Sequence, residues 1–137
     1  MKVLMTNTLH SDTMTSGIRV IADAKYVPER SHPEESYYFF TYKIIIKNEG
    51  ETPIQLLSRH WIIINAHGDR DEVQGPGVIG QHPRLEPGAS FEYTSFCPLN
   101  TDWGTMEGTY RMRSVEGDEF DISIGRFYLT TTAQVYG

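Results

Sequence analysis

The chain has 137 residues, the length of a single domain. Hydrophobic residues make up 39% of it and charged residues 22%, which excludes a disordered, collagen-like or fibrous protein. With 12 basic and 18 acidic residues the net charge is −6, so the overall field does not attract nucleic acid or an anionic membrane.

Apolar residues alternate with polar ones along most of the chain, which is the period of half-buried strands. Clusters of Pro, Gly, Asn and Asp separate these alternating runs and indicate turns. We find no window with helical periodicity, and we expect seven or eight short strands in two antiparallel sheets, an all-β sandwich of the immunoglobulin or fibronectin type III kind. The expected strands, in chain order, are residues 17–26, 38–47, 54–65, 73–81 (a glycine-rich strand or loop), 91–95, 106–113 and 120–129.

The run Ile54–Asn65 is apolar on both faces, so we predict a central strand buried in part on both sides. Alternation does not settle which face points to the core. We place Leu57, Trp61 and Ile63 inward, because the indole has the largest apolar area to bury.

The segment Leu85–Gly88, followed by Phe91 and Tyr93, resembles the corner before a late strand in fibronectin type III domains. In that corner a tyrosine hydroxyl bonds back to the backbone of the turn. This resemblance favours a sandwich of the fibronectin type III kind.

We expect one domain over residues 1–137, with a core at about 17–129, flexible ends and a loosely held tail from Thr130. Cys97 is the single cysteine, which excludes an internal disulfide and favours a buried, inert thiol. The N-terminal apolar run is too short for a signal peptide, and Trp61–Ile64 is far shorter than the ~20 residues of a membrane span. We expect a cytoplasmic protein.

Three segments carry a resemblance beyond fold, in this order and spacing: Leu56–Ile63, Gly75–Gly80 and Gly104–Tyr110. Together they are similar to the ApaG family, and the similarity extends from about Gly17 to Leu129. The resemblance implies a small cytoplasmic bacterial protein with a fibronectin type III-like sandwich and a CorD-like link to cobalt resistance and magnesium efflux. It also implies a relation to interaction modules in eukaryotic F-box proteins and a polymerase-delta-interacting protein. The family's biochemical activity is unassigned.

Gly75, Gly77 and Gly80 spell G-x-G-x-x-G, the string of dinucleotide-binding turns. The motif needs a helix after the turn, and the proline-punctuated, strand-like sequence that follows excludes one. We favour a structural use of these glycines in a bulge or a tight crossing. The alternative is an anion nest of backbone amides assisted by arginines, with these candidate ligand-binding residues: Gly75, Gly77, Val78, Gly80, Arg59 and Arg84.

In the run Arg59-His60-Trp61, strand alternation puts Arg59 and Trp61 on one face and His60 on the other. A functional interpretation makes Arg59 an anion contact. The structural interpretation, which we favour, has Trp61 in the core and the Arg59 stem along apolar surface.

Five histidines are present, but the sequence offers no strong metal motif: only His67 with Asp69 and Asp71 has a ligand-like spacing, and those residues are typical turn formers. We expect no metal site, no cofactor and no catalytic residues. We predict a non-catalytic binding module whose partner is an unidentified protein or a small anionic, phosphate-containing ligand, with no nucleic acid and no membrane, and the oligomeric state left open. The alternative is a phosphate- or nucleotide-binding protein or hydrolase that uses the Gly75–Gly80 loop.

Overall fold

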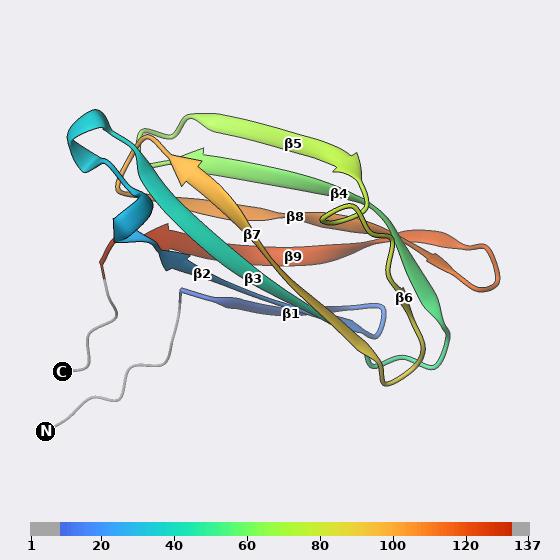
Figure 1. The fold of residues 1–137 in the computed structure, drawn as a ribbon. Helices are drawn as coiled ribbons and strands as arrows, with labels where there is room; N and C mark the ends of the chain where they lie inside the picture. Colours follow the sequence, from blue (N-terminus) through green and yellow to red (C-terminus); the bar gives the residue numbers. More distant parts are fainter. Residues whose placement is uncertain (1–8, 133–137) are drawn as a thin grey trace, which may run out of the picture.

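The computed structural model describes residues 9–132, and its strands form two antiparallel sheets with two short 3-10 turns, η1 (Pro28–Arg30) and η2 (Pro33–Glu35) (Figure 1). The strands are β1 (Ser11–Thr15), β2 (Ile18–Tyr26), β3 (Tyr38–Asn48), β4 (Ile54–Asn65), β5 (Arg70–Pro76), β6 (Arg84–Leu85), β7 (Ser90–Leu99), β8 (Trp103–Ser114) and β9 (Glu119–Thr130).

One sheet has the strand order β1-β2-β3-β7 and the other β5-β4-β8-β9, with β6 paired to β4. The predicted all-β sandwich is therefore confirmed, with nine strands where we expected seven or eight. The extra strands are short: β6 has two residues, and β1 precedes Gly17, outside the expected core. The sequence of β1 is largely polar, so it carries no alternating signal and is held by its pairing with β2.

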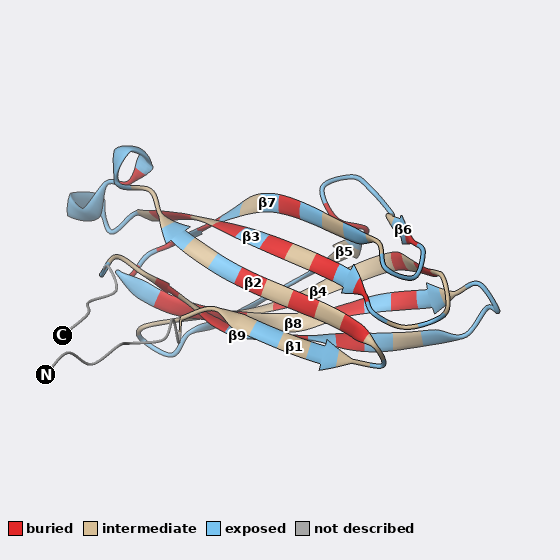
Figure 2. Ribbon diagram, turned by 90° about the horizontal axis from the view of Figure 1, so that it is seen from below, coloured by how far each residue is buried: buried red, intermediate tan, exposed pale blue. Residues whose placement is uncertain are grey.

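Period-two burial places the core between the sheets (Figure 2). In β3 the buried side chains of Phe40, Tyr42, Ile44 and Ile46 point inward, while Lys43 is exposed. Such alternation is what the sequence predicted for a half-buried strand. No helix within residues 9–132 has the length and apolar character needed to cross a membrane.

The β4 strand contains a bulge that shifts which residues face the core. Leu56 pairs with Met112 and Ser58 pairs with Arg111, so β4 has one extra residue, Leu57, between two consecutive residues of β8. Trp61 is 2% exposed, as predicted, and Ile63 packs against the core. The inward placement of Leu57 was wrong, because the bulge gives that core position to Leu56.

The corner before β7 does not form the tyrosine-to-turn bond of fibronectin type III domains. The buried Tyr93 hydroxyl instead shares a hydrogen bond with the hydroxyl of Tyr110 on β8 in the opposite sheet. The corner itself is held by Asn48, whose side-chain amide donates to the carbonyl of Leu85 at 3.0 Å. The tyrosine therefore joins the two sheets rather than the turn.

The two long sides of the sandwich differ. On one side β1 and β2 contact β9, and the Ser11 hydroxyl donates to the Gly125 carbonyl at 2.7 Å. The other side lies between the outer strands β5 and β7, which end their sheets there. This second side is the open side of the sandwich.

The expected core limits, the flexible ends and the tail from Thr130 stay predictions. Residues 133–137 of that tail lie outside the described residues.

Candidate functional site

A groove follows the open side of the sandwich between β5 and β7. It consists of two adjoining cavities of about 350 Å³ and 260 Å³ that share Ile63, Asp71 and Pro98 as lining residues. The larger cavity is also lined by Tyr42, Arg59, Trp61, Val73, Ser95, Phe96, Cys97 and Met106. The smaller one continues past Asn65, Asp69, Arg70, Leu99 and Asn100.

Arg59 is fixed in the larger cavity by the backbone of the glycine loop. Its Nη1 donates to the carbonyls of Pro76 and Gly77, at 2.8 and 2.9 Å. The guanidinium lies over Gly75, where an added Cβ would stand 3.0 Å from Nη2. The absent side chain at Gly75 therefore makes room for the cation.

The charge of Arg59 is not matched by any carboxylate among residues 9–132. Every other arginine there has a charged or aromatic partner: Arg30 lies over a phenyl ring, and Arg19, Arg70, Arg84, Arg111, Arg113 and Arg126 form ion pairs. Both Nη1 protons of Arg59 are used, whereas Nε and Nη2 have no acceptor within the described part of the chain. That free edge is the fork that binds carboxylate or phosphate through two hydrogen bonds.

Protonated side-chain groups line the same cavity as this cation. Burial raises the pKa of the Tyr42 hydroxyl and raises the pKa of the Cys97 thiol to about 12, so both groups keep their protons at neutral pH. Trp61 is buried, and its indole Nε1 has no acceptor among the described residues. The larger cavity therefore holds one cation with neutral donors and, toward the smaller cavity, the carboxylate of Asp71. Its Arg59 part favours a ligand group that supplies negative charge and acceptor atoms.

The glycine loop turns its carbonyls rather than its amides toward Arg59. The Gly77 amide donates to the carbonyl of Leu57, and the Val78 amide donates to that of Gln81, each at 2.9 Å. Val78 is fully buried, and Gly80 has a φ of +76°. The loop-amide nest stays a prediction. For an anion to bind there, the Gly77 and Val78 amides must first break these hydrogen bonds.

The structure thus unites some of the residues that the sequence singled out and separates others. Arg59, Gly75 and Gly77 lie together, while Arg84 lies in β6, pairs with Glu86 at 3.6 Å and does not line the groove. His60 points to the opposite face from Arg59, as predicted, and its Nε2 lies 2.7 Å from a Glu72 oxygen.

Sequence reasoning missed Tyr42 and Ser95 as groove residues and assigned Asp71 to a turn. Alternation from Gly75 puts Asp71 on the same face of β5, and this was the available signal. Asp71 has no ion pair within residues 9–132, and its charge contributes to the raised pKa of Cys97. The approach of β3 and β7 to β5 follows from pairings between distant segments, which local periodicity does not give.

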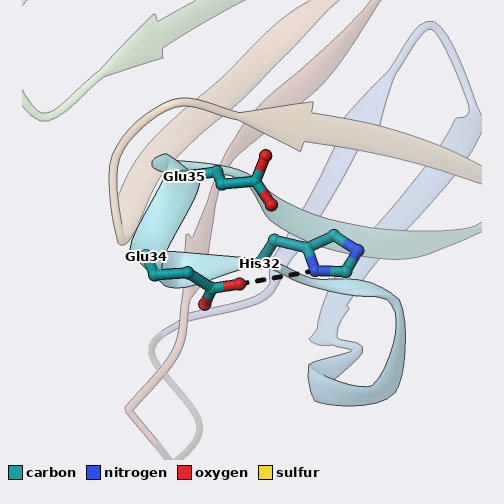
Figure 3. A group of neighbouring side chains, drawn as sticks. All are labelled: His32, Glu34 and Glu35. Carbon is teal, nitrogen blue, oxygen red and sulfur yellow. Dashed lines mark ion pairs between the residues drawn. The ribbon is translucent and has the colours of Figure 1, made fainter.

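Two other surface features are polar but less favourable. A hollow of about 510 Å³ along β4 and β8 shares Arg59 and Gly75 with the site above. Its other arginine, Arg111, is already bound to Glu119 and Asp121 at 3.3 and 3.2 Å. At η2 the ligand atoms of three exposed residues lie within 4.8 Å of one another (Figure 3). These residues are His32, Glu34 and Glu35, a different group from the His67 turn considered in the sequence.

Two facing antiparallel sheets define the class of this protein as an all-β sandwich, with a groove at its open side. The ApaG domain profile (DUF525) matches residues 28–114, and the chain belongs to the ApaG domain family.

Relatives and solved structures agree with this assignment. The chain is 51% identical over 119 residues to Protein ApaG of Anaeromyxobacter dehalogenans, covering 87% of this chain and 94% of the relative. It is 47% identical to Protein ApaG of Bdellovibrio bacteriovorus over 117 residues, which are 85% of this chain and 92% of the relative. A crystal structure described as an ApaA protein from Bordetella pertussis superposes with a TM-score of 0.81 at 46% identity, covering 82% of this chain and 92% of that one.

Proposed function

We propose that this ApaG-family protein is a non-catalytic binding module that seats an anionic group of its ligand on Arg59, inside the open-side groove. The observation that carries the proposal is the fixed guanidinium with an unoccupied Nε and Nη2 edge and no carboxylate partner among residues 9–132. A cation already held by two carbonyls loses little side-chain freedom on binding, which favours affinity.

The chemistry of the lining supports binding over reaction. The Cys97 thiol is protonated, so it lacks the thiolate that a nucleophile requires. No histidine, the most frequent general base, is among the residues that line the described groove. The two carboxylates there, Asp69 and Asp71, both come from the β5 side. The alternative, a phosphate- or nucleotide-binding protein or hydrolase that uses the Gly75–Gly80 loop, requires those amides to turn toward the ligand.

The Arg59 fork requires only that the ligand carry an anionic group. A small phosphate-containing molecule and a carboxylate of a protein partner both fit the Arg59 fork. The net charge of −6 argues against nucleic acid and anionic membranes as partners.

The family resemblance implies a link to cobalt resistance and magnesium efflux. A binding module can have that effect through the partner that it binds, without holding an ion itself. His32 and Glu34 are 62% and 69% exposed and lie 3.6 Å apart, so hydration competes with any ion there. Cobalt titration followed by visible absorption should show weak binding, with a Kd above about 0.1 mM. Micromolar binding that His32→Ala abolishes would assign the cation role to this chain instead.

The test of the groove is an NMR titration of backbone amides with pyrophosphate and, separately, with succinate, at low and high salt. We expect saturable shifts around Arg59, Gly75 and Gly77 with a Kd of about 1 mM that rises with salt. Arg59→Gln should abolish them, while the matched charge change Arg84→Gln, outside the groove, should not.

Arg59→Lys serves as a second variant, because it keeps the charge and removes the fork. It should fold and bind several-fold more weakly. Shifts scattered over all basic residues, or an equal loss in Arg84→Gln, would overturn the proposal.

A further inference from the structure

We infer that the anion on Arg59 is the C-terminal carboxylate of an extended peptide, which lies in the groove as an added strand along β7. This inference rests on the proposed function, since it specifies the ligand of the same site. Capture of a chain terminus beside an exposed sheet edge is an established mode of peptide recognition. Three features of the groove support it: a free strand edge, a matched direction and a second, opposite charge.

The free edge follows from the alternation of hydrogen bonds in antiparallel strands. The Phe39 carbonyl accepts from the Val27 amide, and the Phe39 amide donates to the Ser31 hydroxyl, so Phe39 does not bond to its β7 partner Pro98. The next β7 residue, Cys97, therefore bonds to β3.

The same alternation leaves the backbone groups of every second β7 residue directed away from β3. Near the groove these residues are Thr94 and Phe96, and Phe96 lines the larger cavity. Pro98 presents a carbonyl and no amide at this edge. An extended segment in the groove thus lies beside two residues of β7, Thr94 and Phe96, whose outward backbone groups have no partner within residues 9–132. Pro98 marks the end of this edge.

The direction of β7 sets the direction of the peptide. Ser95 lines the cavity that holds Arg59, while Leu99 lines the adjoining cavity at the far end. A peptide whose last residue reaches Arg59 runs from the Leu99 end to the Ser95 end, antiparallel to β7. Antiparallel pairing is the arrangement already used throughout both sheets.

Asp71 supplies the second charge. It is on the same face of β5 as Gly75, four residues away, which corresponds to ~13 Å along a strand. Its carboxylate has no ion pair among the described residues, so it can receive a basic side chain about four residues before the peptide's C-terminus. Val73 and Phe96 line the same cavity, are 38% and 62% exposed and provide apolar contacts, Phe96 with one ring face stacked on Phe39.

Pyrophosphate satisfies only part of this arrangement. It can occupy the Arg59 fork, but it offers no backbone to the β7 edge and no cation to Asp71. The peptide contacts the Arg59 fork, the β7 edge and Asp71, so the two ligands should shift different sets of backbone amides.

The experiment measures binding of acetyl-Lys-Thr-Val-Thr-Val with a free carboxylate and of the same peptide as the C-terminal amide, by calorimetry and amide NMR. We expect the free carboxylate to bind at least about tenfold more tightly, because the amide cannot form the charged fork contact. The Thr94 and Phe96 amides should shift with the peptide and not with pyrophosphate.

Three variants assign the charges. Arg59→Gln should remove the preference for the free carboxylate, and Gly75→Ala should weaken it by displacing the guanidinium while leaving the charge in place. Asp71→Asn should weaken the lysine peptide about threefold and leave a peptide with threonine in place of lysine unchanged.

The outcomes separate the two proposals. Equal binding of the carboxylate and amide peptides, or shifts that avoid Thr94 and Phe96, would overturn the peptide inference. Binding of pyrophosphate without the peptide would overturn it too and leave the proposed function standing. Binding of neither the peptides, pyrophosphate nor succinate would overturn both.

Discussion

Asn48 shows how one buried polar side chain organises a corner of this fold. It is 1% exposed, and its Nδ2 donates to the carbonyls of Thr52 and Leu85 at 2.9 and 3.0 Å. Its Oδ1 accepts from the Gly50 amide at 3.0 Å. The sequence does not reveal this role of Asn48, because its bond to the distant Leu85 leaves no local pattern.

We therefore predict that Asn48→Ala lowers the free energy of unfolding by about 2 kcal/mol, since buried backbone groups lose their partners. Urea denaturation measures the change. Gln74→Ala, at an exposed position, is the control and should stay within about 0.5 kcal/mol of the parent. Equal stability of the two variants would show that Asn48 does not hold the corner.

Cys97 gives a second prediction at this scale. Burial raises the pKa of its thiol to about 12, so the reactive thiolate is scarce at pH 8. Native protein should react with a disulfide reagent orders of magnitude more slowly than protein unfolded in urea, followed by absorbance. Rapid reaction of the native protein would contradict both the burial and the donor character of this groove residue.

At the scale of elements, the strands were predictable where one face is buried, because alternation then follows directly from burial. The β4 bulge was not, since apolar residues on both faces of Ile54–Asn65 hide a shift of one position. The bond between the Tyr93 and Tyr110 hydroxyls was not predictable either, because hydroxyl pairing across two sheets depends on how the sheets pack.

The candidate site was predictable only in part. Arg59 was identified from the sequence, but beside loop amides, whereas the structure puts loop carbonyls there. Cys97 reaches this groove through the pairing of β7 with β3, and it meets Asp71 of β5 only because the two sheets pack face to face. Sequence spacing therefore located the cation and did not reveal the rest of its cavity.

The glycine loop yields a matched pair of variants. An added Cβ at Gly77, where φ is +59°, would stand 2.3 Å from the Gln81 carbonyl oxygen, while one at Gly80, where φ is +76°, meets nothing within 4 Å. Gly80→Ala should cost about 1 kcal/mol through its backbone angle alone.

Gly77→Ala should cost about 3 kcal/mol or more, because the steric clash adds to the backbone strain. Urea unfolding of both variants gives the comparison. A Gly80→Ala variant that is the less stable of the two would contradict the described loop.

At the scale of the whole molecule, three tyrosines sit between the sheets as neutral donors. Burial is the main cause that raises the pKa of Tyr42, Tyr93 and Tyr110 above the ordinary value of 10.0. In the unfolded chain these hydroxyls ionise near pH 10, while in the folded protein they remain protonated. The folded state thus binds more protons in this range, and stability must fall as pH rises.

We predict that the contribution of these tyrosines to the free energy of unfolding is constant between pH 7 and 9. The free energy of unfolding should then decline through pH 10 and above. Urea titrations at several pH values measure it. Tyr93→Phe removes one of the ionising groups and should make the decline shallower. Stability that stays constant up to pH 11 would contradict a dry interface between the sheets.

The central claim concerns the free guanidinium edge of Arg59, and its side-chain Nε–H resonance reports on that edge directly. The measurement is a ¹⁵N NMR titration of the arginine side chains with the carboxylate-terminated peptide, assigned through Arg59→Lys. We expect a saturable shift of the Arg59 resonance, with the ion-paired Arg111 and Arg126 unmoved. An Arg59 resonance that stays in place while the peptide binds, or that moves equally with every surface arginine, would contradict it.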